Sequence, residues 1–149
     1  MQHRNTIAAI PTAAALAGAC AVVVPAASAS TCAPKTHTLT FISVQEAVHD
    51  YSRTISSQQD RDVNQAGKVV GYDLLYLVFN PKTKTARLNF TAVLSGGFVY
   101  GVASASSNPV IHGTVTGGTG AFKGAAGTIV AKNLNPSGSK TAVTITYHT

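Results

Sequence analysis

The sequence has no tryptophan, two cysteines and few charged side chains. Aromatic residues make up 7% of the 149 residues and charged residues 11%, against about 25% charged in an average soluble protein. Two cysteines exclude a disulfide-dense scaffold and a four-thiolate zinc site. The hydrophobic share of 45% excludes a disordered chain. After residue 29, no stretch shows a convincing period of 3.6 residues, so a helical protein is not expected.

Acidic residues are scarce and confined to one part of the chain. There are 5 of them against 11 Lys and Arg, which gives a net charge of +6. All five lie between residues 46 and 73. The basic residues are scattered singly and are not interleaved with aromatic residues, as stacking platforms for nucleic acid require. We therefore expect a solvated cationic surface and no nucleic-acid partner.

The first 29 residues have the three parts of a secretory signal peptide. Arg4 precedes an uncharged stretch from residue 6 to residue 24, and Ala27-Ser28-Ala29 fits the small-x-small cleavage rule. A membrane anchor and a lipoprotein acylated at Cys20 are weaker alternatives. Cleavage after Ala29 predicts a secreted chain without stable membrane insertion. It consists of a flexible segment at 30–38, with Cys32 as its one cysteine, and a domain at 39–149.

Short strands and turns alternate through the rest of the chain. Glycine, proline and asparagine clusters separate the apolar runs, such as Gly96-Gly97 and Asn108-Pro109. The expected strands are 39–51, 69–80, 86–95, 98–104, 110–116, 127–134 and 142–148, with one more short strand at 121–124. This regular spacing predicts an all-β sandwich or antiparallel barrel.

The predicted strand at 69–80 differs from its neighbours because residues 72–79 are mostly apolar on both faces. The strand at 86–95 instead alternates, with Leu88 and Phe90 on one face and Arg87 and Asn89 on the other. An antiparallel strand that is apolar on both sides needs cover on both sides. In a barrel, the outer cover is a helix, a terminal segment or a second subunit. We therefore expect a homo-oligomer.

Residues 115–129 read VTGGTGAFKGAAGTI, a glycine-rich segment between two predicted strands. Glycine at 117, 118 and 120 permits the positive φ of a tight hairpin, and Gly124 and Gly127 suggest a bulge or a barrel corner. No predicted helix follows the segment, so a phosphate-binding loop is not indicated.

This segment resembles the GGTG-x-F-x-GAxG motif of the dirigent and allene oxide cyclase proteins. Residues 62–73 are similar to the family's entry into its second strand, and residues 143–148 to its last strand. The resemblance spans about residues 39–148 and implies an eight-stranded antiparallel up-and-down β-barrel of the calycin type. It also implies a dimer or trimer, and a pocket that orients a reactive guest.

The resemblance points to two candidate catalytic residues. Glu46 matches by position a first-strand glutamate of allene oxide cyclases, and Asn64 stands where the family often has an aspartate. In the sequence, Glu46 shares a strand face with Ile42 and Val44, where a carboxylate is costly unless it is paired or neutral. A rim ion pair with Arg53 or Arg87 is the alternative to a pocket position.

Four further residues are candidates for ligand contact. Asp62 belongs to a polar cluster before the second predicted strand, which is either a mouth loop that hydrogen-bonds substrate or an ordinary solvated turn. Tyr76 and Tyr100 are either pocket phenols or packed side chains with a hydroxyl at the rim. His112 is a lone strand histidine, for which a structural role is more common than a catalytic one.

Three functions are compatible with the sequence. The first is a secreted barrel that binds a small hydrophobic molecule and guides its cyclisation or stereoselective coupling, as an isomerase or a dirigent protein does. The second is a non-catalytic carrier with the same cavity, and the third a structural surface barrel filled by its own side chains. No cofactor is expected, and the histidines show no metal-ligand spacing.

Overall fold

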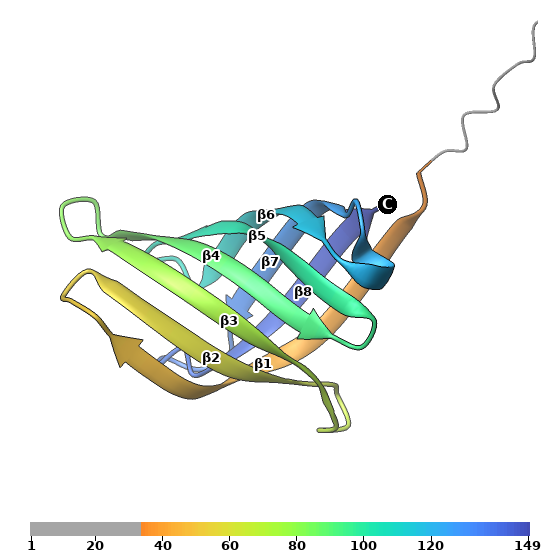
Figure 1. The fold of residues 1–149 in the computed structure, drawn as a ribbon. Helices are drawn as coiled ribbons and strands as arrows, with labels where there is room; N and C mark the ends of the chain where they lie inside the picture. Colours follow the sequence, from red (N-terminus) through yellow and green to blue (C-terminus); the bar gives the residue numbers. More distant parts are fainter. Residues whose placement is uncertain (1–33) are drawn as a thin grey trace, which may run out of the picture. The chain divides into compact units, whose positions relative to one another are not determined.

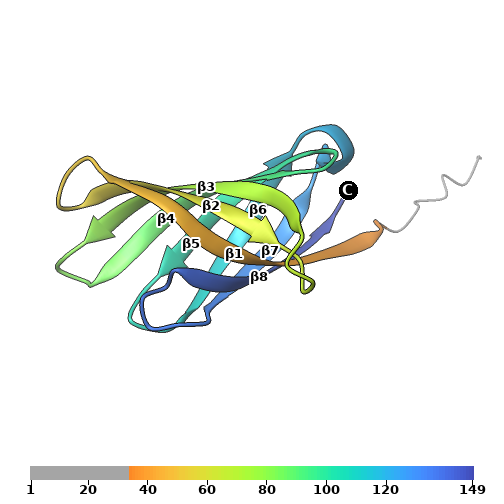
Figure 2. The same cartoon turned by 90° about the horizontal axis from the view of Figure 1, so that it is seen from below.

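The computed structural model describes residues 34–149, which form a closed barrel of eight antiparallel strands (Figure 1). Each strand pairs with the next, and β1 also pairs with β8, which closes the barrel (Figure 2). The predicted eight-stranded up-and-down barrel is confirmed. The strands are β1 (Thr36–Asp50), β2 (Ile55–Val63), β3 (Val69–Asn80), β4 (Thr85–Leu94), β5 (Gly97–Ala105), β6 (Val110–Gly118), β7 (Ala126–Asn133) and β8 (Lys140–His148).

One of the eight strands lies elsewhere in the chain than the sequence predicted. Residues 121–124 were expected to form it, but they belong to a 3₁₀ turn, η1 (Gly120–Phe122), and the residues after it. The missing strand is β2, whose sequence ISSQQDRDV has few apolar residues and so lacks the usual signal of a half-buried strand. In addition, β1 starts at Thr36, within the segment expected to be flexible.

The predicted signal peptide, Cys20 and Cys32 lie outside the described residues. Within residues 34–149, no helix has the length and apolar character needed to cross a membrane.

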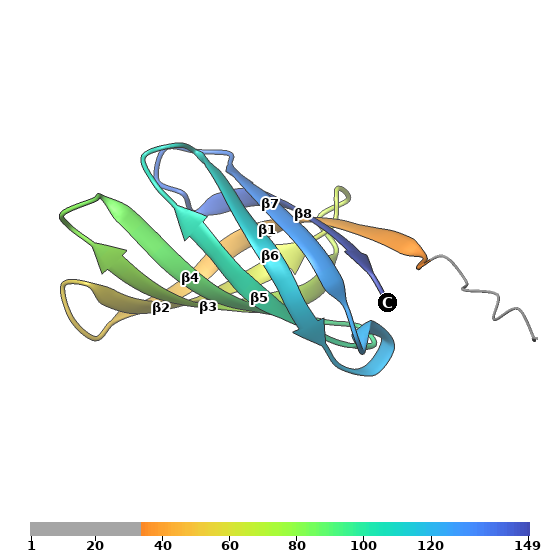
Figure 3. The same cartoon turned by 90° about the horizontal axis from the view of Figure 1, so that it is seen from above.

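The glycine-rich segment packs against the β4–β5 hairpin at one end of the barrel (Figure 3). The Ala121 N–H donates to the Gly96 carbonyl oxygen at 2.8 Å, and the Thr119 N–H donates to the Phe98 carbonyl oxygen at 2.8 Å. Gly120 has a φ of +59°, and a Cβ there would lie 2.1 Å from the Gly96 oxygen. Gly117 and Gly118 do not show the expected positive φ; they lie in β6, where a Cβ at Gly118 would clash with backbone carbonyl oxygens and a Cβ at Gly117 would meet the Tyr100 side chain.

The two ends of the barrel differ in how their interiors are filled. Near η1, the interior is filled by side chains: Val99 and Val115 are at most 1% exposed, Phe122 is 6% exposed, and all three belong to the same buried cluster. Toward the opposite end, near the Asn133–Lys140 connection, the interior side chains leave a cavity. The barrel is therefore closed at the glycine-rich end and hollow at the other.

The outer face of β3 carries a row of exposed apolar side chains. Tyr72, Leu74, Tyr76 and Val78 are 41–51% exposed, and their alternation places them on one side of the strand. Leu75 and Leu77, which alternate with them, line the cavity. Apart from Asp73 on the inner face, residues 72–79 are apolar on both faces, as the sequence indicated.

Candidate active site inside the barrel

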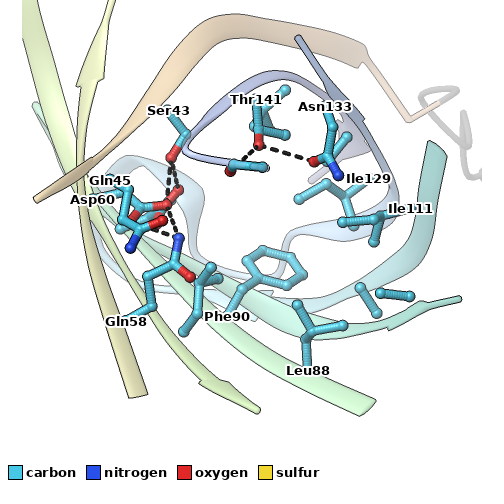
Figure 4. Close-up of a pocket in the computed structure, with 18 of the residues that line it drawn as sticks. Ser43, Gln45, Gln58, Asp60, Leu88, Phe90, Ile111, Ile129, Asn133 and Thr141 are labelled. Carbon is cyan, nitrogen blue, oxygen red and sulfur yellow. Dashed lines mark hydrogen bonds between the residues drawn. The ribbon is translucent and has the colours of Figure 1, made fainter. Parts of the chain in front are cut away.

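The interior cavity has a volume of about 230 Å³ and two kinds of wall (Figure 4). Most of the wall is apolar and comes from β3 to β8. Polar side chains gather on the β1–β3 side, and Asn133 and Thr141 form a second, smaller polar group near the mouth. The apolar wall includes Leu75, Leu77, Leu88, Phe90, Ala103, Ile111, Ile129, Val143 and Ile145.

The strand register brings three aspartates together on the inner face of β2 and β3. Asp60 lies opposite Gln45 of β1 and opposite Asp73 of β3, and Asp62 lies opposite Ser43 of β1. Asp60 and Asp62 are two residues apart on one strand, so their side chains point to the same face. Asp60 and Asp73 line the cavity, whereas Asp62 lies one step closer to the filled end. We call Asp60, Asp62 and Asp73 the aspartate cluster.

All three carboxyl groups are buried, and their hydrogen bonds are incomplete. Asp60, Asp62 and Asp73 are 4%, 0% and 6% exposed. The Gln58 side-chain amide donates to both Asp60 oxygens at 2.8 Å. The Ser43 Oγ lies 3.0 Å from Asp60 Oδ2 and 2.9 Å from Asp73 Oδ2. Among residues 34–149, both oxygens of Asp62 and the Oδ1 of Asp73 have no hydrogen-bond partner.

This geometry requires protons within the cluster. The Ser43 hydroxyl has one hydrogen and can donate it to one carboxylate, so the second contact needs a proton on the other carboxyl group. Burial is the main cause that raises the pKa of each aspartate above its usual 3.8. Burial and the adjacent Asp73 charge raise the pKa of Asp62 to about 8. Burial and the Asp60 charge raise the pKa of Asp73 to about 6.

Such an arrangement can both give and accept protons near neutral pH. A buried acid that stays neutral can donate a proton or a hydrogen bond, and an adjacent carboxylate can accept one. Within the described part of the chain, no group of three or more His, Cys, Asp or Glu is arranged to hold a metal ion. The cluster therefore has the features of an acid–base site that faces an apolar cavity.

Of the six site residues predicted from sequence, Asp62 lies inside the barrel. Its strand is β2, and not the loop that the sequence suggested. Glu46 lies outside, at an irregularity of β1 where the pairing shifts between Gln45 and Ala47. Phe41, Ser43 and Gln45 line the cavity, so the face of Ile42 and Val44, chosen from sequence as the pocket face, is the outer one.

Glu46 pairs with Arg61 on the outer surface, and we expect its replacement to have little effect. Its Oε1 lies 3.2 Å from Arg61 Nε, and both side chains are more than one third exposed. Exposed ion pairs contribute about 0–1 kcal/mol. Glu46→Gln should therefore lower the free energy of unfolding in urea by less than about 1 kcal/mol and leave ligand binding unchanged. A clear loss of binding in this variant would restore Glu46 as a site residue.

The other predicted residues also lie away from the cavity. Tyr76 and Tyr100 are 42% and 41% exposed on the outer face, and Tyr100 lies against Gly117 of the neighbouring strand. His112 is exposed and alternates with the cavity residue Ile111. Asn64 belongs to the β2–β3 turn, where its Oδ1 accepts the Ala66 and Lys68 N–H groups at 3.0 Å. These positions do not place the four side chains against an interior ligand.

Sequence reasoning did not single out Ser43, Gln58 and Asp73. The alternation of polar residues at 58, 60 and 62 is the period of a strand with a polar inner face and could have indicated Gln58, whereas Ser43 and Asp73 join the site only through the register of β1 and β3. From sequence alone this segment resembles a turn, because strands are usually recognised by alternating apolar residues.

No protein-family model matches the chain, and no curated protein matches it in sequence. Solved structures do match its fold. The barrel is similar to a pterocarpan synthase dirigent protein, with a TM-score of 0.64, 18% identity, and 86% of this chain and 98% of that chain covered. It is similar to a pyocyanin demethylase, with a TM-score of 0.62, 19% identity, and 73% and 98% covered.

An exo-specific intermolecular Diels-Alderase has a similar fold as well. Its TM-score is 0.62 at 12% identity, with 77% of this chain and 99% of that chain covered. These identities are low, so the likeness establishes a shared barrel fold of the dirigent type, as the glycine-rich motif indicated, and leaves the chemistry to be argued from the site.

Proposed function

We propose that this barrel, which has the fold of dirigent proteins, binds a small, mostly apolar molecule in its interior and guides its cyclisation or stereoselective coupling. The observation that carries the proposal is the aspartate cluster at the wall of an otherwise apolar cavity. A barrel filled by its own side chains would have no such cavity. A carrier of a neutral apolar molecule would gain nothing from three buried carboxyl groups that resist ionisation.

The apolar wall and the aspartate cluster would have different roles in the reaction. The apolar wall around Phe90 and Leu88 would hold the guest in one folded shape and exclude water, which lowers the entropic barrier to ring closure. A neutral aspartate would give a proton to an oxygen of the guest, and an ionised aspartate would take one from another position. The exchange leaves no net change in protons, so an isomerising cyclisation needs no further reactant.

Product analysis tests this function. Purified wild-type protein and the Asp60→Asn variant would each be incubated with candidate polyenes, or with candidate phenols and an added one-electron oxidant, and the products separated on a chiral column. We expect wild-type protein to give an excess of one stereoisomer and Asp60→Asn to lose most of the rate, because an amide cannot exchange the proton. Tight binding without any turnover would support a carrier instead.

We further propose that the chain is exported and acts outside the cell as a homo-oligomer. Export rests on the predicted signal peptide before Ser30. The oligomer rests on the outer face of β3, which no helix covers within the described residues. Leu74 and Tyr76 border an outer hollow together with Asn89 and Thr91. With no helix of the described chain to cover this apolar face, a second copy of the chain is the cover that we propose.

Leu74→Glu should convert the protein to a monomer. Leu74 is 51% exposed on the β3 outer face, so a carboxylate there is solvated in a monomer but buried in an interface. Light scattering should give a multiple of the chain mass for wild type and the single-chain mass for the variant. Lys82→Glu, in the exposed β3–β4 turn, is the matched control. A monomeric wild-type protein at all concentrations would contradict the proposal.

A further inference from the structure

The charge of the cavity wall is one-sided. Asp60 and Asp73 are its titratable members, and none of its lining residues is Lys, Arg or His. Charged side chains of the neighbouring strands, such as Arg61 and Arg87, alternate with cavity residues and point outward. The chain is basic overall, with a net charge of +6, yet its interior is acidic.

The polar groups of the cluster mainly accept hydrogen bonds. The Gln58 amide is already directed to Asp60, and the Ser43 hydroxyl has one hydrogen for two carboxyl groups. Asp73 lines the cavity, is 6% exposed, and has no partner for its Oδ1. A buried acceptor without a partner costs free energy unless a ligand supplies the donor. When its carboxyl groups are ionised, the site therefore has more acceptors than donors, and none of its lining residues is a cationic donor.

We propose that the cavity binds an organic cation, an amine whose ammonium group lies between Asp73 and Asp60 and whose hydrocarbon body lies against Phe90, Leu88 and Ile129. The proposal rests on the proposed function, because it names the ligand class of that same cavity. An ammonium group has three donors and no acceptor, which matches the acceptors of the cluster. The apolar wall and the absence of a metal-binding arrangement within residues 34–149 favour an organic ion over a metal ion.

A cation would also replace the protons that the cluster now holds. The groups that act on the cluster are the three aspartates themselves and, from β1, the outward Glu46, whose charge slightly raises the pKa of Asp60. The cavity-lining residues of β4 to β8 are uncharged. An arriving ammonium group favours the ionised carboxylates, so its binding should release protons and strengthen as pH rises through the range in which Asp73 and Asp62 titrate.

Three probes of matched size test the proposal: 1-naphthylmethylammonium, 1-naphthylmethanol and 1-naphthoate. Their affinities would be measured by titration calorimetry at about pH 5 and about pH 8, in buffers of different ionisation enthalpy. At the higher pH, we expect the ammonium to bind about tenfold more tightly than the alcohol, and naphthoate about tenfold more weakly. The ammonium should gain affinity between the two pH values and release protons, whereas the alcohol should not.

Variants of the aspartates test whether the preference for the ammonium arises at the aspartate cluster. Asp73→Asn should remove most of the preference for the ammonium and leave the affinity of the alcohol nearly unchanged. Asp60→Asn is the second variant if Asp73→Asn does not fold, and Asp50→Asn, at the exposed end of β1, is the control that should change nothing. If the alcohol binds in the cavity and the ammonium binds no better, the proposal fails and the proposed function stands. If naphthoate binds best, the proposed cation site is wrong. If none of the three probes binds, both the cation site and the proposed function are wrong.

Discussion

Replacing Asp62 with asparagine should raise the melting temperature of the protein by roughly 10 °C at about pH 8. Asp62 is fully buried, and neither of its oxygens has a hydrogen-bond partner among residues 34–149. Its pKa is raised from 3.8 to about 8, mainly by burial and then by the Asp73 charge. The carboxyl group therefore opposes folding whenever the unfolded chain would leave it ionised. An asparagine has the same shape, carries no charge and can donate its amide hydrogens to Asp73.

The sign of the pH dependence follows from that pKa. Because the folded-state pKa lies above the unfolded value, the protonated form favours folding, and this contribution is complete below about pH 4 and lost as pH rises through about 8. The pKa shift alone corresponds to about 5 kcal/mol near pH 8, and burial of the asparagine amide offsets part of it. The gain in the free energy of unfolding from Asp62→Asn should thus be small near pH 4 and about 3 kcal/mol near pH 8.

Thermal melts of wild type, Asp62→Asn and the exposed control Asp50→Asn across this pH range are the check. Asp50→Asn should follow wild type throughout. If Asp62→Asn instead destabilised the protein near pH 8, the ionised Asp62 carboxylate would have a stabilising partner. The aspartate cluster would then contribute to the stability of the fold. A gain in stability together with a loss of activity would instead indicate that the buried charge is retained for function.

Narrowing the mouth of the cavity should abolish ligand binding without disturbing the fold. Ala105, near the end of β5, lines the cavity and is half-buried, so Ala105→Phe directs a phenyl ring into the space that a guest needs. We expect the affinity for 1-naphthylmethanol to fall about 100-fold, which corresponds to about 2.8 kcal/mol. Circular dichroism should retain the wild-type strand signal.

The neighbouring residue supplies the matched control. Ser104 is exposed and alternates with the cavity residues Ala103 and Ala105, so Ser104→Phe adds the same ring to the outer face. It should bind the probe as wild type does. If both variants lose affinity for the probe equally, the added ring acts through stability or aggregation. If both variants keep the wild-type affinity, the ligand binds elsewhere.

The barrel could be predicted because most of its strands show apolar alternation and its turns carry glycine and proline. β2 could not be recognised in the same way, since Gln58, Asp60 and Asp62 occupy the inward positions that apolar residues usually fill. The polar inner face of β2 is also the reason why the aspartate cluster was not recognised from the sequence. A polar inner face resembles a solvated turn until the register places it opposite Ser43 and Asp73.

Other site predictions failed to reach the cavity because alternation alone does not say which face is the inner one. In β1, Ile42 and Val44 suggested a buried face, and Glu46 was assigned to it. The structure turns that face outward, and the irregularity between Gln45 and Ala47 leaves Glu46 beside Arg61. Glu46 does share a face with Ile42 and Val44, as the alternation indicated, but Phe41, Ser43 and Gln45 form the face that lines the cavity.

Methyl NMR with 1-naphthylmethanol tests the central claim, an interior binding site, most directly. β3 offers an internal comparison, because Leu75 and Leu77 line the cavity while Leu74 and Val78 face outward on the same strand. If the ligand binds inside the barrel, the methyl signals of Leu75, Leu77 and Leu88 should shift on titration and those of Leu74 and Val78 should remain in place. Shifts confined to Leu74 and Val78, or no shifts at saturating probe, would contradict the claim.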